Sequence, residues 1–197
     1  MVHFGKSFLK VFVLLLIGIV MTLPVLAQDE KRALLSLGLG RSSSVETSGS
    51  TKVNVGGSFA YKLFENADFY VEPGLYVNWP RKEVLNFGDE NDYLPLSVSA
   101  MTAIFDLNGS YLFVKEEGRF APFVTGGLGF LRNSFSATDG YYAYNLGSDS
   151  HFPKNVGVGF NFFLGEDRNV FFGGLWKNYW SSAGNFHVFS GRVGFRL

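Results

Sequence analysis

The sequence predicts an all-β fold, an eight-stranded antiparallel transmembrane β-barrel preceded by a cleaved signal peptide. Three observations predict it. Glycine and aromatic residues are abundant, with 24 Gly and 22 Phe in 197 residues. After residue 30, no stretch sustains the apolar repeat of three and four residues that an amphipathic helix requires. Short segments instead alternate between bulky apolar residues and small or polar ones, which is the period of a β-strand.

The first element is an export signal. Lys6 and Lys10 precede an apolar run over 11–21, and Pro24 and small residues ending at Ala27 follow it. This order is typical of a secretory signal peptide. The run is shorter than the roughly 20 residues that a helix needs to cross a bilayer, so an N-terminal anchor is the less favoured alternative. We expect residues 1–27 to be removed and residues 28–197 to form one barrel domain.

The composition of the chain excludes several function classes. The 17 basic and 17 acidic residues balance, and loss of Lys6 and Lys10 leaves the mature chain slightly acidic. Without a basic field the chain is not expected to bind nucleic acid. It contains no Cys, which excludes disulfides, Cys-type zinc sites and a lipid-modified N-terminal Cys. No cofactor is expected.

The last segment, 186–197, shows the alternation most clearly. Phe189, Val193, Phe195 and Leu197 share one face with Gly191, whereas Ser190, Arg192, Gly194 and Arg196 share the other. The same pattern places Leu35, Leu37, Leu39, Val53, Val55, Phe59, Tyr61, Val156, Val158, Phe160 and Phe162 opposite small or polar residues. The polar face carries too few charges for a soluble surface. We therefore predict that the bulky face contacts lipid and that the small and polar face lines the lumen, the reverse of a soluble barrel.

Eight such segments follow one another along the chain. They cover residues 33–43, 51–63, 69–79, 97–114, 119–133, 153–164, 169–180 and 186–197. The connections 64–68, 115–118 and 165–168 are short, 44–50, 80–96 and 134–152 are longer, and the last, 181–185, is short. This alternation predicts short periplasmic turns and longer external loops. Asn108-Gly109 is also a strong hairpin signal, but a turn there would leave too few residues for the next crossing, so we place it inside one strand.

The chain resembles the small outer-membrane barrels of the OmpA/OmpX-like superfamily. FYVEPGLYV, LPLSVSAMTAIFDLNGSYLF and FAPFVTGGLGF look like successive strands of the outer-membrane β-barrel domain family, and the resemblance covers residues 33–197. It implies a location in the bacterial outer membrane and contact with its lipid and lipopolysaccharide. It also implies that the barrel-insertion machinery reads the C-terminal strand. That strand ends in Leu197, with Phe195 two residues earlier, and so departs from the usual terminal aromatic residue.

No catalytic or metal-binding residues are predicted. The Gly-rich stretches that begin at Gly38, Gly126 and Gly157 lack a following helix and Lys-Ser/Thr pair, so strand glycine is favoured over a phosphate site. His187 and Ser190 are three residues apart on one strand and face opposite ways, which prevents a catalytic pair. Asp149 and His151 could share a metal, but solvated residues of a mobile loop are the favoured interpretation.

Charged residues are also expected in the lumen. The alternation directs five of them inward, namely Lys62, Glu72, Asp106, Lys177 and Arg192. Ions removed from water need partners, so we predict a mixed-sign network with a structural role. An ion or proton path is the less favoured alternative, and an eight-stranded lumen is too narrow for a general porin.

Aromatic residues suggest an interfacial belt and one candidate binding loop. Tyr61, Trp79, Phe130, Trp176 and Trp180 fall near strand ends, where amphipathic rings prefer the membrane interface. Tyr141, Tyr142 and Tyr144 lie among Gly, Ser and Asp in the connection 134–152, a composition common at recognition surfaces. An interfacial position is an equal alternative for these three.

The leading functional hypothesis is a non-enzymatic outer-membrane barrel with a structural or surface-binding role for an external ligand that the sequence does not identify. The alternatives are an enzyme acting on lipid A or phospholipid, and a narrow pore or secretion accessory.

Overall fold

The computed structural model describes residues 32–44, 51–79, 83–87, 94–113, 118–139, 141–182 and 184–197. The expected signal peptide, 1–27, lies outside these residues, as do most of the connections 44–50, 80–96 and 115–118. The strands are β1 (Ala33–Ser44), β2 (Thr51–Phe64), β3 (Ala67–Trp79), β4 (Glu83–Phe87), β5 (Leu94–Leu112), β6 (Phe120–Thr138), β7 (Ala143–His151), β8 (Lys154–Leu164), β9 (Val170–Ser181) and β10 (Gly184–Arg196). Within the described ranges, no helix is long and apolar enough to cross a membrane.

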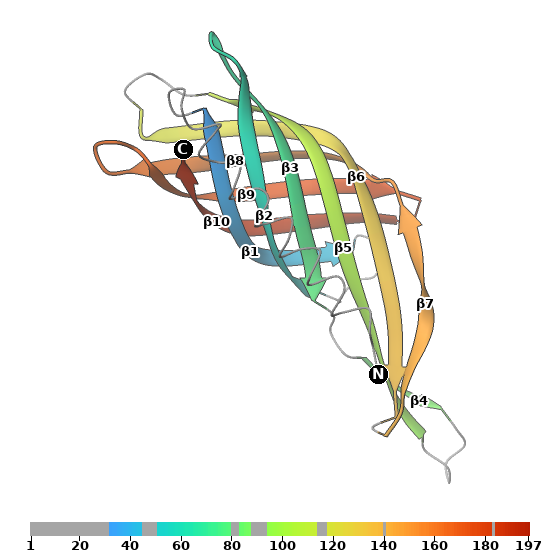
Figure 1. The fold of residues 1–197 in the computed structure, drawn as a ribbon. Helices are drawn as coiled ribbons and strands as arrows, with labels where there is room; N and C mark the ends of the chain where they lie inside the picture. The colour runs from blue at the N-terminus through green and yellow to red at the C-terminus, as the bar shows by residue number, and fades with distance from the viewer. Residues whose placement is uncertain are drawn as a thin grey trace.

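Eight of these strands close into an antiparallel barrel (Figure 1). Their order around the wall is β5, β3, β2, β1, β10, β9, β8 and β6, and the pairing of β5 with β6 closes the ring. The first and last strands pair from Leu34↔Arg196 to Ser44↔Phe186. The backbones of Ala33 and Leu197 also exchange hydrogen bonds of 3.1 and 2.8 Å. The predicted eight-stranded barrel is therefore confirmed. The β2–β3 turn, the β8–β9 turn and both ends of the barrel sequence lie at one rim, which we call the turn end.

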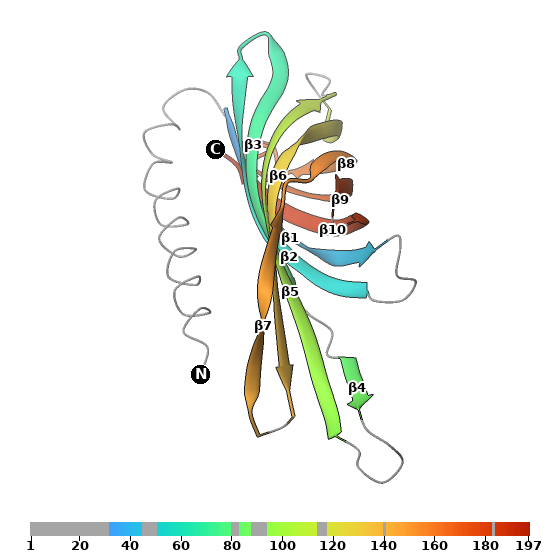
Figure 2. The ribbon, with the colours of Figure 1, turned by 90° about the vertical axis from the view of Figure 1, so that its right-hand side faces the viewer.

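Two predicted loops are wrong in part, because the structure contains further strands there. Strand β4 lies within the predicted connection 80–96 and pairs with the first residues of β5. The predicted connection 134–152 is the end of β6 paired with β7, from Leu131↔His151 to Thr138↔Ala143. Both hairpins extend from the barrel wall at the rim opposite the turn end, which we call the loop end (Figure 2). Residues 144–150 are all exposed, so backbone pairing forms this strand without the alternation in burial that sequence patterns detect.

The Asn108-Gly109 pair lies inside β5, as predicted. Asn108 is opposite Gly127 and Gly109 is opposite Gly126, in a pairing that runs without interruption from Ser97 to Leu112. A long strand satisfies these backbone groups through the sheet, which a membrane-spanning segment requires.

The two faces of the wall have the predicted character. Outward-facing side chains such as Leu39 and Phe189 are 64% and 65% exposed, whereas inward-facing Ser36 and Ser190 are buried. Apolar side chains left uncovered on all sides of a barrel are stabilised by lipid and not by water. The exterior is therefore a lipid-facing surface.

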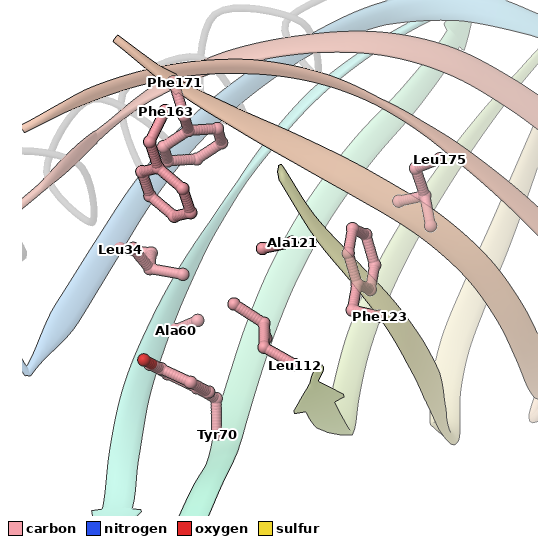
Figure 3. Packing of buried hydrophobic residues seen from close by; sticks show 9 residues of the cluster. All are labelled: Leu34, Ala60, Tyr70, Leu112, Ala121, Phe123, Phe163, Phe171 and Leu175. Atoms are coloured by element: carbon pink, nitrogen blue, oxygen red, sulfur yellow. The ribbon is translucent and has the colours of Figure 1, made fainter. Parts of the chain in front are cut away.

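Inside the barrel, the side chains form three layers. An apolar cluster near the turn end contains Leu34, Ala60, Tyr70, Leu112, Ala121, Phe123, Phe163, Phe171 and Leu175 (Figure 3). A second apolar cluster, toward the loop end, contains Tyr76, Ile104, Leu131, Tyr179 and Val188. Strand β5 passes from Ile104 in the second cluster through buried Asp106, Asn108 and Ser110 to Leu112 in the first. Polar residues therefore occupy a layer between two apolar ones.

Candidate functional site

The polar layer contains an ion pair between strands that are not neighbours. Lys177 Nζ on β9 lies 3.0 Å from Asp106 Oδ2 on β5. The same carboxylate oxygen accepts a hydrogen bond of 2.7 Å from the Tyr179 hydroxyl. The ammonium also lies 5.2 Å from the centre of the Tyr76 ring. Because β5 and β9 are separated by β6 and β8 in the sheet, this pair joins the wall through the lumen.

A second ion pair lies beside it in the same layer. Arg192 Nη1 on β10 lies 3.6 Å from Glu72 Oε1 on β3. Ser58 and Ser110 donate hydrogen bonds to the two oxygens of Glu72. Arg192 Nε donates to Asn161 Oδ1 at 3.0 Å. These contacts compensate for the loss of water around both charges.

Lys62 is not part of this layer, although the alternation along its strand predicts it there. Its Nζ lies 2.9 Å from Asp68 Oδ1, and its side chain is 20% exposed. The register between β2 and β3 shifts between Lys62 and Phe64, beside the turn that joins the two strands. Lys62 therefore lies near the rim at the turn end, where a partly hydrated partner is available.

The tip of the β6–β7 hairpin contains the three candidate binding tyrosines. Tyr141 is 93% exposed and Tyr142 is 69% exposed, so both rings face solvent. Asp139 orders the turn, because its Oδ1 accepts hydrogen bonds from the backbone N–H groups of Tyr141 and Tyr142 at 2.9 and 2.7 Å. The Tyr144 hydroxyl donates to Asp139 Oδ2 at 3.1 Å. The exposed rings are thus carried on an organised turn.

These bonds perturb two titrating groups at the tip. The backbone N–H groups of Tyr142 and Tyr141 hold the pKa of the Asp139 carboxyl below its usual 3.8. The hydrogen bond to that carboxylate raises the pKa of the Tyr144 hydroxyl. Both shifts favour the ionised carboxylate and the protonated phenol at neutral pH.

The structure also shows the surroundings of the two histidines. His187 stacks on Trp176, with ring centres 5.8 Å apart, while Ser190 is buried in the lumen, so the two residues face opposite ways as expected. His151 and Asp149 lie on β7, not in a mobile loop, with Nε2 and Oδ2 3.1 Å apart. Among the described residues, no group of three or more metal-ligating side chains is clustered.

Four of the five rings of the expected aromatic belt are exposed on the outer face, whereas Tyr61, near the turn end, is only partly exposed. Trp79, Trp176 and Trp180 are 58%, 40% and 41% exposed, and Phe130 is 38% exposed. Trp79 ends β3 and Trp180 is one residue from the end of β9. Positions at the loop end of a lipid-facing wall are where amphipathic rings favour the membrane interface.

No family model and no curated protein matches this sequence. Solved structures match its fold. Neisserial surface protein A is 12% identical, with a TM-score of 0.56 over 84% of this chain and 96% of that one. A major outer membrane protein from Thermus thermophilus is 12% identical, with a TM-score of 0.53 over 84% and 99%. The attachment invasion locus protein Ail of Yersinia pestis is 11% identical, with a TM-score of 0.51 over 84% and 97%. The chain has the fold of the small outer-membrane β-barrels.

Proposed function

We propose that this chain is an integral outer-membrane protein whose closed barrel holds the β6–β7 hairpin outside the membrane as a binding surface. Tyr141, Tyr142 and Tyr144 are its contact residues. In this role the barrel wall is an anchor and the polar layer a structural element.

The position of the hairpin tip carries the proposal. Phe130 is an exposed ring of the aromatic belt, and β6 continues for eight residues from there to Thr138. At about 3.3 Å per residue, this is roughly 26 Å beyond Phe130, measured along the strand. Rings that merely anchor a barrel lie at the interface itself. The distance therefore favours recognition over interfacial anchoring for Tyr141 and Tyr142.

The chemistry of the tip agrees with this role. Tyrosine rings provide a large contact area at a low cost in conformational entropy, and small polar neighbours adapt their hydrogen bonds to a partner. Asp139 orders the turn before any partner arrives, which lowers the entropic cost of binding.

The layered lumen supports an anchor over a pore. The charged layer lies between two apolar clusters, and an ion that entered would have to leave water beside apolar side chains. We expect the purified barrel to show no stepwise conductance in planar bilayers. Regular single-channel steps from the folded protein would favour the narrow-pore alternative.

Binding is tested with the folded protein on arrays of purified oligosaccharides and of cell-surface and matrix proteins. The variants are a triple Ser replacement of Tyr141, Tyr142 and Tyr144, and a chain in which 138–148 is a short Gly/Ser turn. Tyr61→Ser, which removes a tyrosine at the other end of the wall, is the matched control. We expect each array signal of the native chain to fall at least tenfold in both hairpin variants and to persist in the control. Unchanged signals in the hairpin variants, or no signal from the native chain, would reject the binding role.

A further inference from the structure

Three polar side chains from two parts of the chain meet at the loop end of the barrel. Asp149 and His151 are two residues apart on β7 and therefore project from the same face. Ser182 belongs to the turn between β9 and β10. His151 Nδ1 lies 2.9 Å from Ser182 Oγ, and His151 Nε2 lies 3.1 Å from Asp149 Oδ2. A hydroxyl in contact with an imidazole that in turn contacts a carboxylate is the arrangement of the catalytic triad of serine hydrolases.

A chain of hydrogen bonds fixes the carboxylate end of this arrangement. Asn133 on β6 is directly opposite Asp149, and its side-chain amide hydrogen-bonds that carboxylate. Thr102 Oγ1 donates to Asn133 Oδ1 at 2.8 Å, so the amide nitrogen is the group that faces Asp149. Supporting contacts of this kind set the orientation of a catalytic group.

The same contacts set the ionisation of the carboxylate. Partial burial alone would raise the pKa of Asp149, but hydrogen bonds from His151 and Asn133 outweigh it and hold the pKa below its usual 3.8. An ionised Asp149 accepts the Nε2–H of His151. The proton of a neutral imidazole then resides on Nε2, which leaves the Nδ1 lone pair for the Ser182 hydroxyl. The two ring nitrogens have exchanged the roles they have in chymotrypsin-like triads, and either nitrogen can act as the base once the carboxylate fixes the tautomer.

The position of the three residues restricts the substrate. His151 is directly opposite Leu131, a buried member of the apolar cluster toward the loop end, so both side chains lie on the inner face of the wall. Partly buried Phe186 packs against the same cluster. Ser182 is exposed. A substrate therefore reaches Ser182 from solution at the mouth of the barrel, where the apolar cluster that contains Leu131 lies beside His151.

We propose that Ser182, His151 and Asp149 form a serine esterase site that cleaves short-chain carboxylic esters at the external mouth of the barrel. Ser182 Oγ bonds to the ester carbonyl carbon while its proton moves to His151 Nδ1. The bond from that carbon to the alkoxy oxygen breaks, and the departing alcohol takes the proton from His151. Water then attacks the acyl-Ser182 carbonyl and gives one proton to His151. The carboxylic acid leaves, and Ser182 recovers its proton from His151. Asp149 stabilises the transient imidazolium.

The test uses the folded chain in detergent micelles, with folding checked by heat-modifiable gel migration. The probes are p-nitrophenyl butyrate and a fluorophosphonate, with mass spectrometry to locate the labelled residue. We expect the fluorophosphonate to label Ser182, and kcat/KM to fall at least 100-fold in Ser182→Ala and in His151→Gln. Asp149→Asn removes the charge that fixes the tautomer, so its kcat/KM should be at least tenfold lower than that of the native chain.

Two matched controls separate this site from background chemistry. Ser181→Ala removes the adjacent hydroxyl, which donates to the Gly184 carbonyl at 3.0 Å. His187→Gln removes the histidine stacked on Trp176. Both controls should retain the native rate and the label. Loss of activity in His151→Gln with full activity in Ser182→Ala would mean hydrolysis by the imidazole alone and would overturn the proposal. Absence of label on Ser182 in the folded chain would overturn it equally.

Discussion

Lys177 and Asp106 lie 3.0 Å apart in the lumen, with 2% and 0% of their side chains exposed. They come from strands that do not touch in the sheet, as do Arg192 and Glu72. Each pair therefore links opposite parts of the wall. Such a layer makes the barrel sensitive to loss of one partner, because the remaining charge has no access to water.

We expect Lys177→Met to lower the free energy of unfolding by about 3–5 kcal/mol, because it leaves Asp106 buried without its counter-ion. Urea unfolding in lipid vesicles, followed by Trp fluorescence, measures the change. Lys62→Met is the control, since the Lys62–Asp68 pair is partly exposed and such a pair contributes at most about 1 kcal/mol. Equal losses in the two variants would show that the buried pair has no special role.

Gly127 is the site of a second prediction. A Cβ atom added there would overlap the Leu107 carbonyl oxygen and lie 2.8 Å from Asn108 Cα on the neighbouring strand. Gly127→Ala should therefore destabilise the barrel by roughly 1–3 kcal/mol and reduce the heat-modifiable fraction, because the strands must move apart. At Gly191 the nearest atom to an added Cβ is 3.9 Å away, so Gly191→Ala should fold like the native chain. A native-like Gly127→Ala would contradict the close approach of β5 and β6.

The barrel strands could be predicted because each has one face in lipid and the other in a small polar lumen. That contrast produces the alternation in Leu35–Leu39 and in the last strand. Strands β4 and β7 could not be predicted in this way. Leu146 on β7 is 56% exposed, and the side chains on both faces of 144–150 meet solvent, so pairing with β6 leaves no trace in hydrophobic periodicity.

The inward positions of the charged residues could be predicted from the sequence, but their ion-pair partners could not. The alternation of side chains along each strand is enough to place Glu72, Asp106, Lys177 and Arg192 on the lumen side. Which carboxylate meets which cation depends on the stagger between distant strands, and a single sequence does not specify that stagger. The contact between Ser182 and His151 could not be predicted for a related reason. A search for His and Ser on one strand face tests only sequential neighbours, whereas His151 and Ser182 are brought together by the folding of different hairpins.

The turn at the hairpin tip should respond to acid. Because the folded pKa of Asp139 is lowered, its bonds to Tyr141 and Tyr142 stabilise the turn above pH 3.8, and this contribution is lost as the pH falls through the lowered value. We expect the amide NMR signals of both tyrosines to titrate with a common midpoint below 3.8. Asp139→Ala should abolish this titration and accelerate chymotrypsin cleavage at the tip. A midpoint at or above 3.8 would contradict the ordered turn.

The last prediction concerns orientation in the membrane. The export signal expected over 1–27 delivers the chain to the periplasm, and the β2–β3 and β8–β9 turns lie at the same rim as Ala33 and Leu197. The β6–β7 tip should therefore face the exterior, and the β8–β9 turn should face the periplasm. The chain has no Cys, so Tyr141→Cys and Glu166→Cys each introduce a single thiol at an exposed position. In intact cells, a membrane-impermeant maleimide should label only Tyr141→Cys, and after lysis it should label both. Labelling of Glu166→Cys alone in intact cells would invert the topology and move the proposed esterase site and the tyrosine tip to the periplasmic side.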